Sequence, residues 1–155
     1  MAEAAAWAKD KGLDFLQMLQ DIYIKYGFSR EEGISVVRQG KSGAEEIVAM
    51  MKNFRSNPPK SLGGSEVILI KDYDSLNLTD VKAGKVEKMD MPTTSNVLQF
   101  FTEDGTKISV RPSGTEPKIK FYVEVKGKME NGAEYDKAIA DADAKIALIK
   151  KDLGI

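Results

Sequence analysis

Cysteine and histidine are both absent from this chain of 155 residues. The absence of cysteine excludes disulfide bonds, zinc–thiolate sites and cysteine nucleophiles. The absence of histidine removes the commonest general base near neutral pH and the commonest ligand of transition metals. Chemistry that depends on either side chain is therefore excluded for this chain.

The chain also lacks an excess of either charge, since 23 basic and 24 acidic residues give a formal net charge of -1. Binding to nucleic acid or to an anionic membrane needs a clustered basic face, which these mixed charges do not provide. No apolar run approaches the roughly 20 residues of a membrane-spanning helix, and residues 1–7 do not have the form of a secretory signal. We therefore expect a cytoplasmic location and neither nucleic acid nor membrane as a partner.

Hydrophobic residues make up 42% of the chain, which is enough for the core of one ordinary domain with a short appendage. The apolar spacing and the hairpin signals predict an α+β fold, with N-terminal helices followed by a mainly antiparallel sheet of four to five strands covered by two helices. The segment from Asp74 to Ser95 is predicted to be a polar loop. Helices are predicted at 2–10, at 13–26, after a capping box at 42–45 and from a cap at Asn131 to Leu153, and strands at 34–38, 67–70, 96–102, 106–111 and 119–126.

The second predicted helix carries a broad apolar stripe. Leu16, Leu19, Tyr23 and Tyr26 recur at helical spacing along residues 13–26. Two interpretations fit a stripe of this width. It packs either on the domain's own core or on a part of a longer protein.

One segment, residues 111–117, combines the features of an anion-binding loop between two predicted strands. Arg111 offers a planar guanidinium that can bind two phosphate oxygens, and Ser113 and Thr115 offer hydroxyl donors. Gly114 allows a sharp backbone turn, so that successive N–H groups can point into one concavity, a nest. These residue types predict a phosphate site.

Charged residues follow on the C-terminal side of this loop. Lys118 and Lys120 add positive charge, and strand alternation predicts that both point to the same face. Glu116 argues against an anion site, because a carboxylate repels phosphate unless it orients Arg111 or a backbone amide. Composition alone leaves a second interpretation open, namely an ordinary hairpin turn with solvated lysines.

The sequence Arg-Pro-Ser-Gly-Thr-Glu-Pro at 111–117 resembles the phosphate-binding loop in the C-terminal domain of the phosphohexomutases, the phosphoglucomutase/phosphomannomutase family. The resemblance continues through residues 100–105 before the loop and 118–122 after it. Residues 52–60 are similar to phosphoglucomutases of the bacterial type. The resemblance therefore covers most of the chain.

This resemblance implies a fold, a division of the chain and an activity. Residues 29–155 are expected to form the C-terminal phosphate-binding domain, with a TATA-box-binding-protein-like α+β fold. Residues 1–28 are expected to be the closing helices of the preceding domain or a linker. Enzymes of the family move phosphate between C1 and C6 of a hexose, and this loop holds the phosphate that is not reacting. The implied partners are a hexose phosphate and the N-terminal domains of the parent protein.

The family's phosphoserine loop, metal loop and sugar-reading loop lie in its earlier domains. No catalytic residue, metal site or cofactor is therefore expected in this chain, and Mg²⁺ is expected only in the parent enzyme, an isomerase that acts as an intramolecular phosphotransferase. The chain alone is expected to be inactive. The residues that the resemblance implies for contact with the substrate phosphate are Arg111, Ser113, Gly114, Thr115 and Lys118, with Glu116 and Lys120 ranked below them.

Two other patterns are interpreted as structural. Residues 40–42 match the end of a P-loop, but Ser35 stands where that motif needs glycine, and a helix cap explains the residues. Asp72, Asp74 and Asp80 do not have the spacing of an EF-hand, so we expect them in a solvated loop.

An alternative function is that of a non-catalytic interaction module with the same fold and no phosphosugar ligand. Its most specific form is a homodimer through the N-terminal helices, with Leu16 and Leu19 in the contact. An apolar helical stripe that finds no partner within its own chain favours such an interface.

Overall fold

The computed structural model describes residues 1–155, which form two compact units. The first unit contains residues 1–30 and 126–144, and the second contains residues 31–125 and 145–155. These units group segments by their packing, and the division into 1–28 and 29–155 stays a prediction. No helix is long and apolar enough to cross a membrane.

The first unit contains two of the predicted helices, α1 (Ala2–Asp10) and α2 (Phe15–Tyr26). Asp14 caps α2, because its carboxylate accepts from the Gln17 amide at 2.7 Å while the Gln17 side chain accepts from the Asp14 amide at 2.8 Å. The helix therefore begins slightly later than the spacing predicted. None of its residues is buried, so the apolar stripe stays accessible to water.

Aromatic contacts connect α2 with the rest of the first unit. The Tyr23 ring meets Phe28, the first residue of β1 (Phe28–Val37), edge-on with centroids 5.0 Å apart. Tyr23 also stacks on Tyr135, the first residue of α4 (Tyr135–Leu153), at 6.4 Å. Before α4, the side chain of Asn131 accepts from the Ala133 amide and caps the short 3-10 helix η1 (Gly132–Glu134), as the sequence predicted for this cap.

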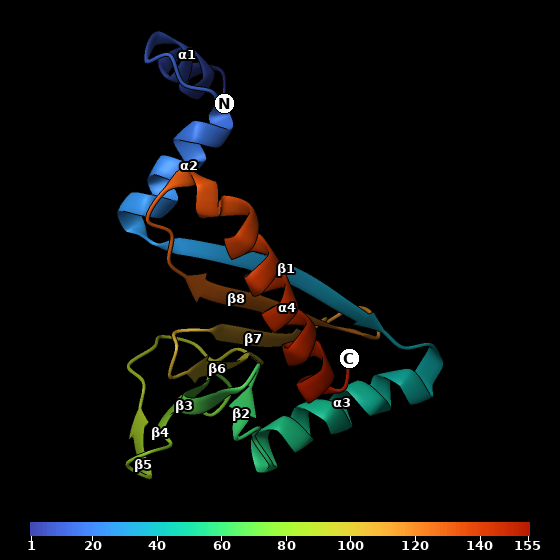
Figure 1. Ribbon diagram of the computed structural model, residues 1–155. Coiled ribbons are helices and arrows are strands. Elements are labelled where there is room, and N and C mark those ends of the chain that lie inside the picture. The colour runs from blue at the N-terminus through green and yellow to red at the C-terminus, as the bar shows by residue number, and fades with distance from the viewer. The chain divides into compact units, whose positions relative to one another are not determined.

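The second unit contains most of the eight-stranded sheet, in the order β1-β8-β7-β6-β3-β4-β5 with β2 paired to β3 (Figure 1). The pairings from β2 to β8 are antiparallel. The predicted α+β class with a mainly antiparallel sheet is confirmed, but the predicted count of four to five strands is wrong. The remaining strands are β2 (Ser61–Leu62), β3 (Ser65–Asp72), β4 (Asn77–Asp80), β5 (Lys85–Lys88), β6 (Leu98–Thr102), β7 (Lys107–Pro112) and β8 (Lys118–Gly127).

Two of the unpredicted strands lie in the segment expected to be a polar loop. β4 and β5 are short and largely polar, and no residue in either is buried. They form because their backbones continue the ladder beyond β3, which needs no apolar alternation in the side chains. In the turn between them, the Asp80 carboxylate accepts from the Ala83 amide at 2.8 Å.

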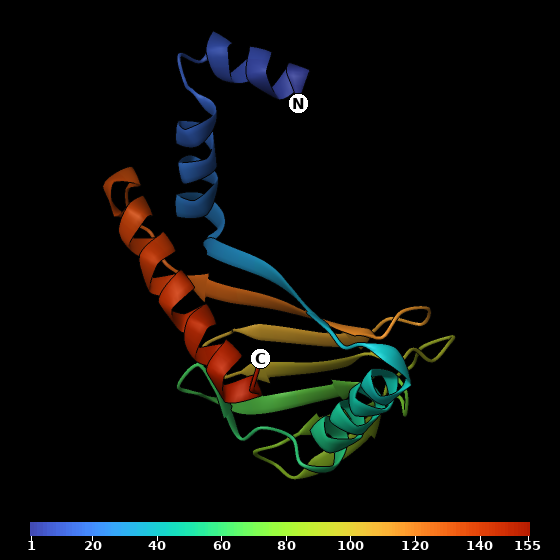
Figure 2. The same ribbon diagram turned by 90° about the vertical axis from the view of Figure 1, so that its right-hand side faces the viewer.

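One face of the sheet forms the core with α3 (Gly40–Ser56) and the C-terminal half of α4, and Figure 2 shows both helices in front of the strands. Phe54 of α3 meets Phe100 and Phe121 edge-on, with centroids 6.2 and 6.1 Å apart. Burial alternates along β6, β7 and β8, so the residues between the core positions point to the opposite face. The buried side chains of this core include Ile47, Met51, Leu98, Ile108, Val110, Ile119, Val123, Ile146 and Ile149.

The start of α3 differs from the predicted capping box at Ser42. The helix begins at Gly40, which has a φ of 69°, and Gln39 gives no side-chain cap. Gly43 determines this entry, because a Cβ added there would lie 2.6 Å from Cβ of Arg38. The chain therefore turns into the helix through close backbone packing and not through the Ser42 hydroxyl.

Candidate functional site

The predicted loop lies at the tip of the hairpin formed by β7 and β8. Arg111 pairs with Lys120 in the antiparallel register, and Pro112 pairs with Ile119. The Ser113 amide donates to the carbonyl of Lys118 at 2.8 Å and closes the loop. The strand–turn–strand context expected for this motif is therefore present.

The register of this hairpin brings two of the predicted residues together. Arg111 and Lys120 alternate with buried neighbours, so both point away from the core, on the same face. Directly opposed residues in an antiparallel pair have Cβ atoms roughly 5 Å apart, and like charges in such positions repel. The arrangement is suited to an anion that both side chains can contact.

The hydroxyl of Ser113 organises the turn. Its oxygen accepts from the Thr115 amide at 3.4 Å and from the Glu116 amide at 3.3 Å. A hydroxyl has two acceptor positions and one donor, so these bonds leave its proton available to a ligand. The predicted nest of backbone amides is not formed, because two of its donors are directed to this oxygen.

Gly114 also differs from its expected role. It is not among the glycines with positive φ, so the turn does not depend on a left-handed backbone there. A Cβ added to Gly114 would have no atom within 4 Å. The glycine therefore keeps open space beside the loop, which a bound group can occupy.

Lys118 lies on the same face of β8 as Lys120, as the alternation predicted, but it has a partner within the loop. Its ammonium group forms an ion pair with the carboxylate of Glu116. The hydrogen bond and the positive charge of Lys118 lower the pKa of Glu116 from its ordinary value, with a smaller contribution from Lys120. Glu116 thus orients a lysine, whereas the sequence suggested Arg111 or a backbone amide.

The loop forms one wall of a pocket of about 850 Å³, and α3 forms the other. The amide of Arg38, at the end of β1, donates to the carbonyl of Pro117 at 2.9 Å and connects the loop to the chain that enters α3. Three cationic residues of α3, namely Lys41, Lys52 and Arg55, line the pocket together with apolar side chains. The sequence reasoning did not select these cations, although Lys52 and Arg55 lie within the segment 52–60.

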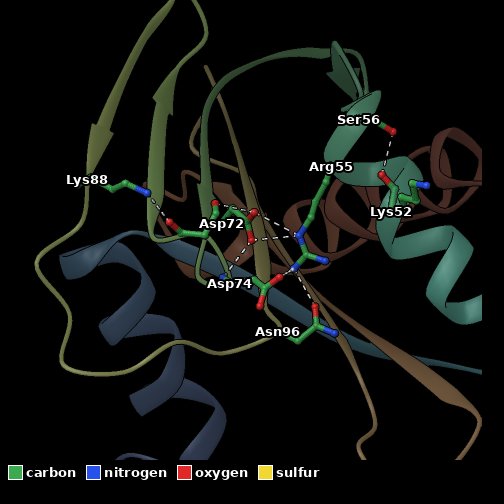
Figure 3. A network of polar contacts seen from close by, with 8 residues as sticks. Lys52, Arg55, Ser56, Asp72, Asp74, Lys88 and Asn96 are labelled. Carbon is green, nitrogen blue, oxygen red and sulfur yellow. Dashed lines mark hydrogen bonds and ion pairs between the residues drawn. The ribbon is translucent and has the colours of Figure 1, made fainter.

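Arg55 is fixed in place by a polar network at the edge of this pocket. Figure 3 shows it pointing from α3 toward Asp72, the last residue of β3, and toward Asp74 and Asn96 in the connections that follow β3 and precede β6. Its Nε lies 3.2 Å from both carboxylate oxygens of Asp72, and its Nη2 lies 2.8 Å from Oδ1 of Asn96 and 3.9 Å from Asp74. Asp72 and Asp74 therefore have structural partners. No group of three or more acidic side chains lies close enough to hold a metal ion.

The sequence of this chain matches known proteins. The family described as phosphoglucomutase/phosphomannomutase, C-terminal domain, matches residues 70–142, which include β7, the loop and β8. Phosphoglucomutase of Staphylococcus saprophyticus is 37% identical over 111 residues, which cover 72% of this chain and 20% of that protein. Phosphoglucomutase of Staphylococcus epidermidis is 35% identical over 123 residues, which cover 79% of this chain and 22% of that protein.

The chain thus spans about a fifth of the length of the curated relatives it matches. A solved structure of pp63/parafusin (phosphoglucomutase) from Paramecium covers 95% of this chain with 25% of its own, at 15% identity and a TM-score of 0.42, a likeness too loose to support an argument. The sequence matches are sufficient without it. The chain belongs to the phosphoglucomutase/phosphomannomutase family, whose C-terminal domain it carries.

Proposed function

We propose that the loop from Ser113 to Pro117, together with Arg111, Lys118 and Lys120, binds the phosphate of a hexose phosphate. The observation that supports this most directly is the register that sets Arg111 opposite Lys120 at the base of the loop. Two cations on one face, next to a hydroxyl whose proton is available, match the charge and the acceptor oxygens of a phosphate. Open space beside Gly114 leaves room for the ligand.

In the parent enzyme, the phosphate held here is the one that does not react while the other is transferred between C1 and C6. Binding energy from a remote phosphate can then orient the reacting group. We assign Mg²⁺ and the phosphoryl-transfer chemistry to the other domains of the parent, and we expect this chain alone to be inactive. Glucose and mannose phosphates are the substrates that the family description suggests.

Isolated from those domains, the loop should bind weakly. Each charge-assisted hydrogen bond contributes about 1.5–3 kcal/mol, whereas association costs several kcal/mol in lost freedom. A dissociation constant on the order of 1 mM follows, which corresponds to a binding free energy of about -4 kcal/mol.

The test is a titration with inorganic phosphate and with glucose 1-phosphate, followed by NMR of the backbone amides. Shifts should concentrate at residues 113–118, and Arg111→Ala should weaken binding about ten- to hundredfold because it removes a bidentate charged contact. Lys107→Ala is the matched control, since Lys107 lies on the same face of β7 but already pairs with Glu124 of β8. Equal losses in both variants would show that general positive charge, and not the loop, attracts the anion.

The alternative of an interaction module has its own supporting observation. Phe15, Leu16 and Tyr26 of α2 have exposed fractions of 43%, 48% and 74%, which leaves an apolar surface open to a partner or to a second copy of the chain. The same titration separates the two functions. If neither ligand shifts the loop up to about 50 mM, a range that would detect even very weak binding, phosphate binding by this chain is wrong.

A further inference from the structure

The loop contains an ion pair between two of its own residues. The carboxylate of Glu116 binds the ammonium group of Lys118, and the Lys118 amide donates to the Glu116 carbonyl at 2.7 Å. The Glu116 side chain is 59% exposed, whereas that of Lys118 is 28% exposed. Lys118 is therefore folded back onto the loop by a partner that remains largely in water.

This ion pair affects any anion that enters the loop. Arg111, Lys118 and Lys120 carry three positive charges, and Glu116 reduces their sum to two. A phosphate monoester carries about -1.5 to -2 at neutral pH, so it can replace Glu116 as the partner of Lys118. Both anions need the same ammonium group. The Glu116 carboxylate is ionised at neutral pH, as any glutamate with an ordinary pKa is, and the hydrogen bond from Lys118 lowers its pKa further.

We propose that Glu116 is an internal competitor for the phosphate, which must displace its carboxylate from Lys118 to bind fully. This inference depends on the proposed phosphate binding by the loop. The displaced carboxylate can turn into water, because most of its surface is already exposed. The competitor lowers the affinity of the loop and speeds the release of the phosphate.

The opposite role for Glu116 predicts the opposite result. If Glu116 serves to aim Lys118 at the phosphate, its removal must weaken binding. If it competes, its removal must strengthen binding. Replacement by glutamine keeps the shape of the side chain and removes its charge, so the sign of the change in affinity separates the two roles.

The experiment compares phosphate affinity and dissociation rate in the wild type, Glu116→Gln and a matched control, by NMR titration and line shapes at low salt. The control is Glu87→Gln, since Glu87 pairs with Lys85 two residues away on β5 and both side chains are exposed. Glu116→Gln should bind inorganic phosphate about two- to fivefold more tightly, the range expected for releasing an exposed ion pair, and should release it more slowly. Glu87→Gln should leave both quantities unchanged.

A double-mutant cycle with Lys118→Gln tests whether Glu116 acts through this lysine. In the Lys118→Gln background the gain from Glu116→Gln should shrink toward onefold. An undiminished gain would overturn the inference, because the carboxylate would then repel phosphate directly. If Glu116→Gln binds phosphate no more tightly than the wild type, while Arg111→Ala weakens the binding of the wild type as predicted, the inference is overturned and the proposed function stands. No binding in either the wild type or Glu116→Gln overturns both.

Discussion

Replacing Arg55 by methionine should lower the free energy of unfolding by about 1.5–3 kcal/mol, the usual net contribution of hydrogen bonds to charged groups. The ion pair of Arg55 with Asp72 is intermediate in burial between a surface pair and a fully buried pair. The Arg55 and Asp72 side chains are 25% and 16% exposed, which is too buried for the weak contribution of a surface pair. They are too exposed for the loss of about 3–5 kcal/mol that follows when a fully buried pair is broken. Methionine keeps the apolar stem, so the loss reports on the guanidinium.

The control is Lys82→Met, which removes an exposed ion pair from the same unit. Nζ of Lys82 lies 2.6 Å from Oε1 of Glu103, and the two side chains are 55% and 60% exposed, so water screens the pair and only a small loss of stability is expected. Unfolding in urea, followed by the amide signals of α3 and β3, measures both variants. A loss for Arg55→Met no larger than that for Lys82→Met would refute the contribution assigned to this network.

A double-mutant cycle then assigns the contribution to its partner. Asp72 also accepts from the Asp74 amide at 3.1 Å and from the Ser75 hydroxyl at 2.9 Å, so Asp72→Asn should be destabilising by itself. Because Arg55 and Asp72 share one contact, the double variant should lose less than the sum of the two single losses. Additive losses would mean that the two side chains act independently.

Two further predictions concern other parts of the second unit. Gly43→Ala should destabilise the protein by about 1–2 kcal/mol, because the overlap of its Cβ with Arg38 costs more than the gain in helix propensity. Ser42→Ala is the control and should be nearly neutral. Urea unfolding measures both variants. Burial alone would raise the pKa of Asp104, but hydrogen bonds from Lys145 and two threonines hold it well below its ordinary 3.8. The stability that this carboxylate contributes is present above its ordinary pKa and is lost as the pH falls from there toward the lower pKa of the folded state. Asp104→Asn should therefore lose less stability than the wild type between about pH 5 and pH 2.5.

The local features of the site could be predicted from the sequence, whereas its contacts between side chains could not. The hairpin and its loop follow from strand alternation and from a motif of seven neighbouring residues, and the structure places them where expected. The pairing of Glu116 with Lys118 depends on which of several rotamers each side chain adopts. The spacing of residues does not determine that choice, because a carboxylate two positions away competes with water and with other cations.

Elements that depend on distant segments were also missed. β4 and β5 have no apolar alternation, and they become strands because the edge of β3 pairs with β4 and the edge of β4 pairs with β5. The entry of α3 follows from the packing of Gly43 on Arg38, whereas Ser42 and Glu45 only resembled a capping box. In both cases a backbone contact from outside the segment overrides the local signal.

The two ends of the β7–β8 ladder carry different pairs of opposed charges. At the end away from the loop, Lys107 stands opposite Glu124 and the two form an ion pair, whereas next to the loop Arg111 stands opposite Lys120. Opposed like charges destabilise a hairpin by several tenths of a kcal/mol, so stability alone would favour an acid at one of these positions. An anion in the loop removes this repulsion. Arg111→Ala removes the repulsion, so it should not lower the stability of the free protein, although it should weaken the proposed binding of phosphate.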